Sequence, residues 1–89
     1  MSLLNDITRE LQADGYPDLV SYENSTEYVF EVELEPTYED NFVDDLEDVL
    51  LFLGYSPVED FDGIVINKIG NSPYEGFDLF QLELYKDNY

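Results

Sequence analysis

A regular alternation of acidic and apolar side chains runs through residues 27–35, which read EYVFEVELE. Successive side chains of a β-strand point to opposite faces of a sheet, so this pattern predicts a strand with one buried and one acidic face. The predicted buried face holds Tyr28, Phe30, Val32 and Leu34, and the predicted acidic face holds Glu31, Glu33 and Glu35. Residues 19–23 are also β-rich and precede the turn-forming sequence NST, so the two segments are expected to form a hairpin.

Before this hairpin, residues 3–14 show the periodicity of an amphipathic helix. The apolar residues that recur at helical spacing are Leu4, Ile7 and Leu11. Ser2 is a candidate N-cap, and Gly15 provides a stop signal. We therefore expect a first helix over residues 3–14.

A second helical stripe follows the hairpin, over residues 38–53. Its apolar residues are Phe42, Leu46, Val49, Leu50 and Leu53, and it ends at Gly54. Thr37, with Asp40 three residues later, resembles a weak capping box at its start. The stripe predicts a helix with one apolar face and one acidic face.

The last part of the chain contains two further β-rich segments, at residues 64–69 and 77–86, joined by a turn that begins GNSP. The predicted order is therefore α-β-β-α-β-β, within a single acidic domain over residues 1–89. This order is a cyclic permutation of the ferredoxin-like β-α-β-β-α-β arrangement. We expect an α+β fold in which a four-stranded antiparallel sheet carries both helices on one face.

The two halves of the sequence resemble each other. A shift of 39 residues places Ile7 on Leu46, Leu11 on Leu50 and Gly15 on Gly54. A shift of 50 residues places EVEL at residues 31–34 on QLEL at residues 81–84. This pattern predicts an internal repeat whose second hairpin is longer than the first.

Charge is the most unusual property of the composition. The chain has 22 Asp and Glu residues but three Lys and Arg residues, for a formal net charge of -19. Residues 10–67 hold 17 carboxylates and no Lys or Arg, so neighbouring salt bridges are unable to neutralise them. This charge disfavours direct binding to nucleic acid or to anionic lipid, and the expected partner is a basic protein.

The residue types present argue against an enzyme. The chain has no His, Cys or Trp, so the usual general base, the thiolate nucleophile and the softer metal ligands are missing. The sequence DFDG at residues 60–63 resembles the start of an EF-hand loop, but its register would put Val58 and Ile69 at positions that require carboxylates. We therefore predict no catalytic residues, no metal site and no cofactor.

Carboxylates at regular spacing are the candidate binding residues. Side chains four apart on a helix lie about 6 Å apart along its axis, and side chains two apart on a strand lie about 6.6–6.8 Å apart. Both spacings approximate that of successive phosphates in a nucleic-acid strand. Leu51 falls within the acidic face of the second helix, as a candidate apolar anchor. The predicted partner-binding residues are Glu31, Glu33, Glu35, Glu39, Asp40, Asp44, Asp45, Glu47, Asp48, Leu51, Glu59, Asp60 and Asp62.

The chain has an acidic run over residues 27–62, few Lys and Arg residues and a small size. In these three properties it resembles the small acidic DNA-mimic proteins. Many of those proteins are phage-encoded inhibitors of restriction enzymes or of CRISPR effector complexes. The resemblance is one of composition, since such proteins share no common fold or motif. It implies an inhibitor that blocks the basic DNA- or RNA-binding cleft of another protein in the host cytoplasm.

Other interpretations of the acidic surface remain open. The chain is also compatible with an immunity protein or antitoxin that neutralises a basic nuclease toxin, or with an acidic structural or assembly partner without nucleic-acid competition. General solubility and adaptation to high salt are two further explanations of the charge. The sequence predicts no membrane span and no signal peptide, hence a cytoplasmic protein, and leaves a monomer and a homodimer open.

Overall fold

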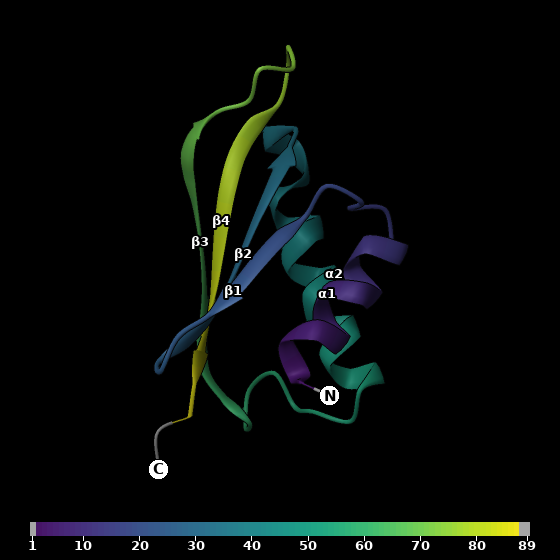
Figure 1. Ribbon diagram of the computed structural model, residues 1–89, viewed down its shortest axis with the longest axis vertical. Helices are drawn as coiled ribbons and strands as arrows, with labels where there is room; N and C mark the ends of the chain where they lie inside the picture. The colour runs from purple at the N-terminus through teal and green to yellow at the C-terminus, as the bar shows by residue number, and fades with distance from the viewer. Residues whose placement is uncertain (1, 88–89) are drawn as a thin grey trace.

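A computed structural model describes residues 2–87 of the chain (Figure 1). Two helices and four strands alternate along it in the predicted order α-β-β-α-β-β. The elements are α1 (Leu3–Ala13), β1 (Val20–Glu23), β2 (Glu27–Leu34), a 3-10 turn (Pro36–Tyr38), α2 (Glu39–Phe52), β3 (Phe61–Asn71) and β4 (Asp78–Lys86).

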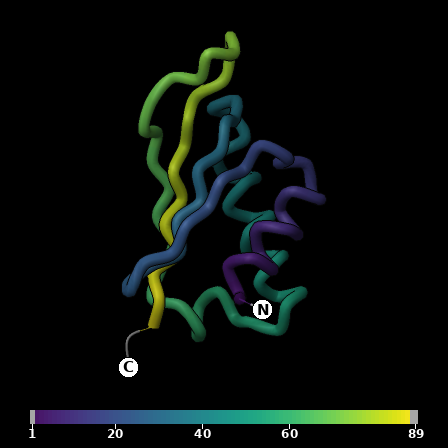
Figure 2. Tube along the Cα trace, viewed as in Figure 1, coloured from purple at the N-terminus to yellow at the C-terminus, as the bar shows by residue number. Residues whose placement is uncertain are grey.

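The four strands form one antiparallel sheet in the order β1-β2-β4-β3. Figure 2 shows the C-terminal strand, in yellow, between β2 and β3. Both helices lie on the same face of this sheet, so its other face has no helix over it (Figure 1). Moving β4 to the start of the chain would give the ferredoxin-like order, so the predicted fold class and its permutation are confirmed.

The core lies between the helices and the sheet, as the apolar periodicity predicts. Its buried residues include the predicted strand positions Phe30, Val32, Leu34, Leu82 and Leu84 and the predicted helix positions Ile7, Leu11, Phe42, Leu46, Val49 and Leu50. Burying such side chains away from water is the main stabilising contribution in a domain of this size. The intervening residues Glu31 and Glu33 are only half-buried and lie on the face without helices.

Local side-chain hydrogen bonds fix two of the predicted boundaries. The Ser2 hydroxyl accepts a hydrogen bond from the Asn5 backbone N–H at 3.1 Å, which caps α1. In the hairpin turn, the Asn24 side-chain oxygen accepts hydrogen bonds from the backbone N–H groups of Thr26 and Glu27, at 2.9 and 2.8 Å. Asn24 therefore supplies the turn between β1 and β2.

Two local expectations are wrong. The capping box of Thr37 and Asp40 does not form, because Pro36 starts a 3-10 turn and the N-cap of α2 is Tyr38, which makes no side-chain cap bond. The third strand runs over Phe61–Asn71 rather than residues 64–69. It continues through irregularities in its pairing at 61–63 and 68–70, where the sequence signalled an end.

The structure supports the internal repeat. Each helix ends in a glycine with positive φ, Gly15 at 120° and Gly54 at 94°, followed by a tyrosine whose N–H bonds back to the helix. Tyr16 N–H bonds to the Leu11 carbonyl at 3.2 Å, and Tyr55 N–H bonds to the Leu50 carbonyl at 2.9 Å. In the sheet, residue 31 pairs directly with residue 81, its equivalent under the shift of 50.

Candidate functional site

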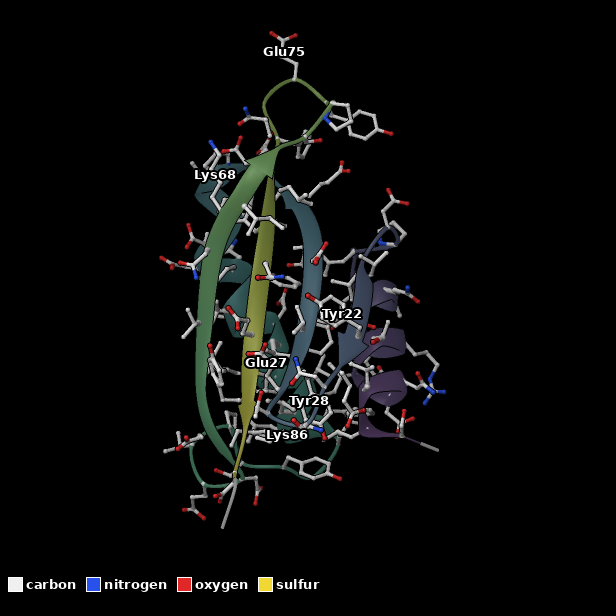
Figure 3. The ribbon with its side chains drawn as sticks, turned by 60° about the vertical axis from the view of Figure 1, so that its left-hand side comes forward. Tyr22, Glu27, Tyr28, Lys68, Glu75 and Lys86 are labelled. Atoms are coloured by element: carbon white, nitrogen blue, oxygen red, sulfur yellow. The ribbon has the colours of Figure 1, made fainter. Side chains whose placement is uncertain are left out.

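Every Lys and Arg of the chain is already paired within the molecule. Arg9 lies 2.9 Å from Asp6, Lys68 lies 3.5 Å from Asp78, and Lys86 lies 2.7 Å from Glu23. Lys86 also donates to the Asn24 carbonyl and lies over the Tyr28 ring, 4.8 Å from its centroid (Figure 3). Three ion pairs use three of the 22 Asp and Glu side chains, so 19 of these carboxylates have no Lys or Arg partner.

The exposed face of α2 carries one group of the predicted binding residues. Asp40, Asp44 and Asp48 are exposed and follow one another at one-turn intervals, about 6 Å along the axis. Glu39 and Glu47 on the same helix are half-buried. Leu51 is 59% exposed, as expected for an apolar residue within this acidic face. This face is therefore a row of carboxylates with an apolar residue at its C-terminal end.

A cleft of about 660 Å³ collects a second group of carboxylates near the start of α2. It brings together the loop after α1, the end of β2, the first turns of α2 and the residue before β4. Four of the predicted residues line it, namely Glu33, Glu35, Asp44 and Asp45. The sequence did not indicate that Asp14, Tyr16 and Phe77 also line it, because they come from segments far from α2 in the chain.

Tyr16 links the loop after α1 to α2 at this cleft. Its hydroxyl donates a 2.5 Å hydrogen bond to Asp45 Oδ2, and its ring lies edge-on to Phe42 with 4.9 Å between ring centroids. Partial burial and then the Asp45 carboxylate raise the pKa of the Tyr16 hydroxyl above its ordinary value. The hydroxyl therefore stays protonated and fixes the position of Asp45 at neutral pH.

The face of the sheet turned away from the helices, here called the open sheet face, holds a third group. Two cross-strand rows at its centre are Val20–Glu31–Gln81–Asn67 and Tyr22–Val29–Glu83–Val65. Residues two apart on a strand point to the same side of a sheet, so Glu27 and Glu33 lie on this face together with Val29 and Glu31, on either side of these rows along β2. Figure 3 shows this side of the sheet, with helices behind the strands.

The remaining predicted residues lie in the connection from α2 to β3 and at the start of β3. Asp60 Oδ2 accepts a 2.6 Å hydrogen bond from the Ser56 N–H, and the Ser56 hydroxyl accepts one from the Glu59 N–H at 3.1 Å. Asp60 therefore has a local structural role in this turn. Glu59 and Asp62 are exposed beside it.

The predicted binding residues consequently do not form a single site. Glu31 lies on the open sheet face, whereas Asp40, Asp44 and Asp48 belong to a helix that packs on the opposite face. Carboxylates thus cover several sides of the molecule. Within residues 2–87, no three acidic side chains are grouped so that they could hold a metal ion, and no helix is both long and apolar enough to cross a membrane.

Comparisons of this chain with protein-family models, with curated proteins and with solved structures gave no match.

Proposed function

We propose that this protein is a non-enzymatic inhibitor that occupies the basic DNA- or RNA-binding cleft of another protein, with carboxylates in the places of phosphates. The observation that carries the proposal is the set of 19 carboxylates without a Lys or Arg partner, in a fold whose three cations are all paired internally. A surface of this kind attracts Lys and Arg over long distances and accelerates association with a basic protein.

The size of the charge supports the comparison with a nucleic acid. B-DNA carries one charge per ~1.7 Å of axis, so a duplex as long as this molecule would carry about 24 charges. The longest dimension of the protein is 41 Å and its formal charge is -19. The charge per unit length therefore approaches that of duplex DNA, although the protein distributes it over several faces.

The row of carboxylates on α2 supplies the phosphate-like spacing. Asp40, Asp44 and Asp48 are exposed at about 6 Å intervals, and the cleft beside the start of α2 adds Asp45 and Glu35. We propose that this acidic side enters the basic cleft of the target. We propose that the target is a nuclease of a host defence system, of the restriction or CRISPR type, and that the inhibitor is phage-encoded.

Nucleic-acid competition on a purified target tests this function. Tagged protein would be used to isolate binding proteins, and each would be titrated with a DNA duplex or an RNA in the presence of the inhibitor. We expect mutual exclusion, because both ligands require the same Lys and Arg side chains. A target that binds nucleic acid and this protein together, each with unchanged affinity, would contradict the proposal.

The row on α2 gives a specific mutational prediction. Changing Asp40, Asp44, Glu47 and Asp48 to Asn or Gln should weaken binding to the target by a combined ~1–4 kcal/mol, since each exposed ion pair contributes ~0.2–1 kcal/mol. The apolar stripe of α2 is retained and repulsion is relieved, so the variant should fold at least as well. Stopped-flow binding should show the loss mainly in the association rate. Unchanged rates and affinity would place the contact elsewhere.

A further inference from the structure

We infer that the open sheet face is a docking surface for a basic protein, and that Tyr22 and Val65 make its leading apolar contacts. This inference extends the proposed function, because it requires a basic partner but no competition with nucleic acid. It concerns the side of the sheet opposite to the helices and therefore a different surface from the row on α2.

The first observation is that this face combines a buried centre with exposed apolar neighbours. Val29 is 1% exposed although it lies outside the core cluster beneath the helices. Tyr22 and Val65, at the two ends of its cross-strand row, are 47% and 41% exposed, and Val20 in the next row is 56% exposed. Exposed aromatic and aliphatic residues beside a buried centre are suited to contact another protein.

The second observation is the charge of the face. Four glutamates lie on it, namely Glu27, Glu31, Glu33 and Glu83. Lys68 and Lys86 pair with Phe80 and Phe61, so both side chains belong to the helix-bearing side of the sheet. Arg9 is on α1. The open sheet face therefore carries negative charge with no Lys or Arg on it.

Two of these glutamates accept hydrogen bonds from uncharged side chains. Glu31 accepts a 3.3 Å hydrogen bond from Gln81, which also bonds the Tyr22 hydroxyl at 3.2 Å. Glu33 accepts from the Ser72 hydroxyl at 2.9 Å. These bonds orient the carboxylates without neutralising them, so less conformational freedom is lost when a cationic side chain binds.

Charge complementarity indicates which kind of partner binds the open sheet face. A second copy of the chain would bring four more glutamates against this face, and nucleic acid or an anionic membrane would be repelled in the same way. The glutamates lie on the two central strands β2 and β4, whereas Tyr22 and Val65 lie on the edge strands β1 and β3. A protein surface with Arg or Lys along its centre and apolar residues on both sides satisfies both features. The Arg or Lys side chains would pair with the glutamates between the contacts of Tyr22 and Val65.

A synthetic helical peptide with an arginine stripe flanked on both sides by leucines is a suitable probe. In a titration of the ¹⁵N-labelled full chain, we expect the largest amide shifts at residues 20–22, 29–31, 65–67 and 81–83. The double variant Tyr22→Ser/Val65→Ser should bind the peptide about tenfold more weakly, since a few apolar contacts contribute most of the binding free energy of a protein interface. The same peptide with glutamate in place of arginine should not bind.

The control variant is Phe52→Ser/Val58→Ser, which removes one exposed aromatic and one exposed aliphatic residue outside this face and should change affinity about twofold or less. If the Tyr22→Ser/Val65→Ser protein fails to fold, Val20→Ser/Glu31→Gln replaces it, and several-fold weaker binding is expected. The inference would be overturned if the control and test variants lost the same affinity for the peptide, or if the largest amide shifts were on α2. It would also be overturned if the glutamate peptide bound as tightly as the arginine peptide. Concentration-dependent dimerisation through the same amides would also overturn it. The titration contains no nucleic acid, so its outcome is independent of the competition test.

Discussion

At the scale of single residues, Glu83 shows how closely packed the carboxylates are. The neighbouring Glu27 carboxylate, as an acceptor for the protonated form, raises the pKa of the Glu83 carboxyl, against the opposite effect of the Tyr85 hydroxyl, which donates to it at 3.0 Å. Glu27 and Glu83 are diagonal neighbours on the open sheet face, and Lys68 and Lys86 lie on the other side of the sheet. The Glu83 carboxyl therefore takes up a proton more readily than an isolated glutamate does.

This pair predicts a stabilising substitution. A raised pKa in the folded state means that Glu83 favours folding below its ordinary pKa and that this contribution is lost as the pH rises through the raised value. Glu83→Gln should therefore increase the free energy of unfolding at pH 7, by roughly 0.2–1 kcal/mol as expected for relief of cross-strand like charges. The gain should be smaller at pH 4, below the ordinary pKa of a glutamate, because Glu83 is protonated more often there than at pH 7.

Urea unfolding at the two pH values measures this difference. Glu75→Gln, at the tip of the β3–β4 hairpin in Figure 3, is the matched control because it removes the same charge far from Glu27. An equal gain in unfolding free energy for both variants at pH 7 would show that only the overall charge matters. If Glu83→Gln gave no gain, repulsion between Glu27 and Glu83 would not destabilise the protein.

At the scale of secondary-structure elements, the two helices end in the same way. Gly15 and Gly54 both have positive φ, and the following tyrosines bond back to the last turn. The side chains of the two tyrosines then differ: Tyr16 packs against the core beside Phe42, whereas Tyr55 is exposed and lies near Phe61. The repeated feature is therefore the backbone geometry of the helix end.

The positive φ of Gly54 predicts a cost for a side chain at this position. Gly54→Ala should lower the free energy of unfolding by about 1–2 kcal/mol, because a Cβ disfavours the left-handed conformation. Beyond the adjacent residues, a Cβ added at Gly54 would meet no heavy atom within 4 Å, so the cost arises from the backbone and not from a clash. Chemical denaturation measures the effect.

Gly70→Ala is the matched control, since a Cβ at Gly70 also meets open space and the residue lacks the left-handed φ. Its effect should be small. If Gly54→Ala were as stable as the wild type, or if Gly70→Ala were equally destabilised, the helix end would not be the reason for the glycine.

At the scale of the whole molecule, repulsion among unpaired carboxylates acts against folding. The chain concentrates its charge in a body of 41 × 23 × 21 Å, and three ion pairs compensate only a small part of it. At 0.1 M salt the Debye length is about 10 Å, which is shorter than every dimension of this body. Screening should therefore remove much of the long-range repulsion.

Added salt should consequently raise the melting temperature of the protein between low and moderate ionic strength. The variant with Asp40, Asp44, Glu47 and Asp48 neutralised should start from a higher melting temperature and respond less to salt. Differential scanning calorimetry in sodium chloride measures both proteins. A melting temperature that stays constant or falls as salt is added would mean that the carboxylates are better compensated than the three ion pairs indicate.

The local patterns of the sequence were sufficient to predict the helices and strands and the face that each of them buries. Alternation at residues 27–35 identified the buried side of β2, and helical spacing identified Leu46 and Leu50 as core residues. These periodicities depend only on backbone geometry, so a short stretch of sequence is enough to reveal them. The end of β3 was less predictable, because pairing with β4 carries the strand through bulges at glycines that also occur in turns.

The arrangement of the acidic residues depended on tertiary structure. The sequence determined their number, the lack of compensating cations and their spacing within each element. It did not determine that Glu31 and Asp44 lie on opposite sides of the sheet, nor that Asp14, Tyr16 and Phe77 join Asp45 around one cleft. Spacing along a helix or strand is set by local geometry, whereas proximity between elements is set by the packing of their apolar faces, which places side chains from distant segments together.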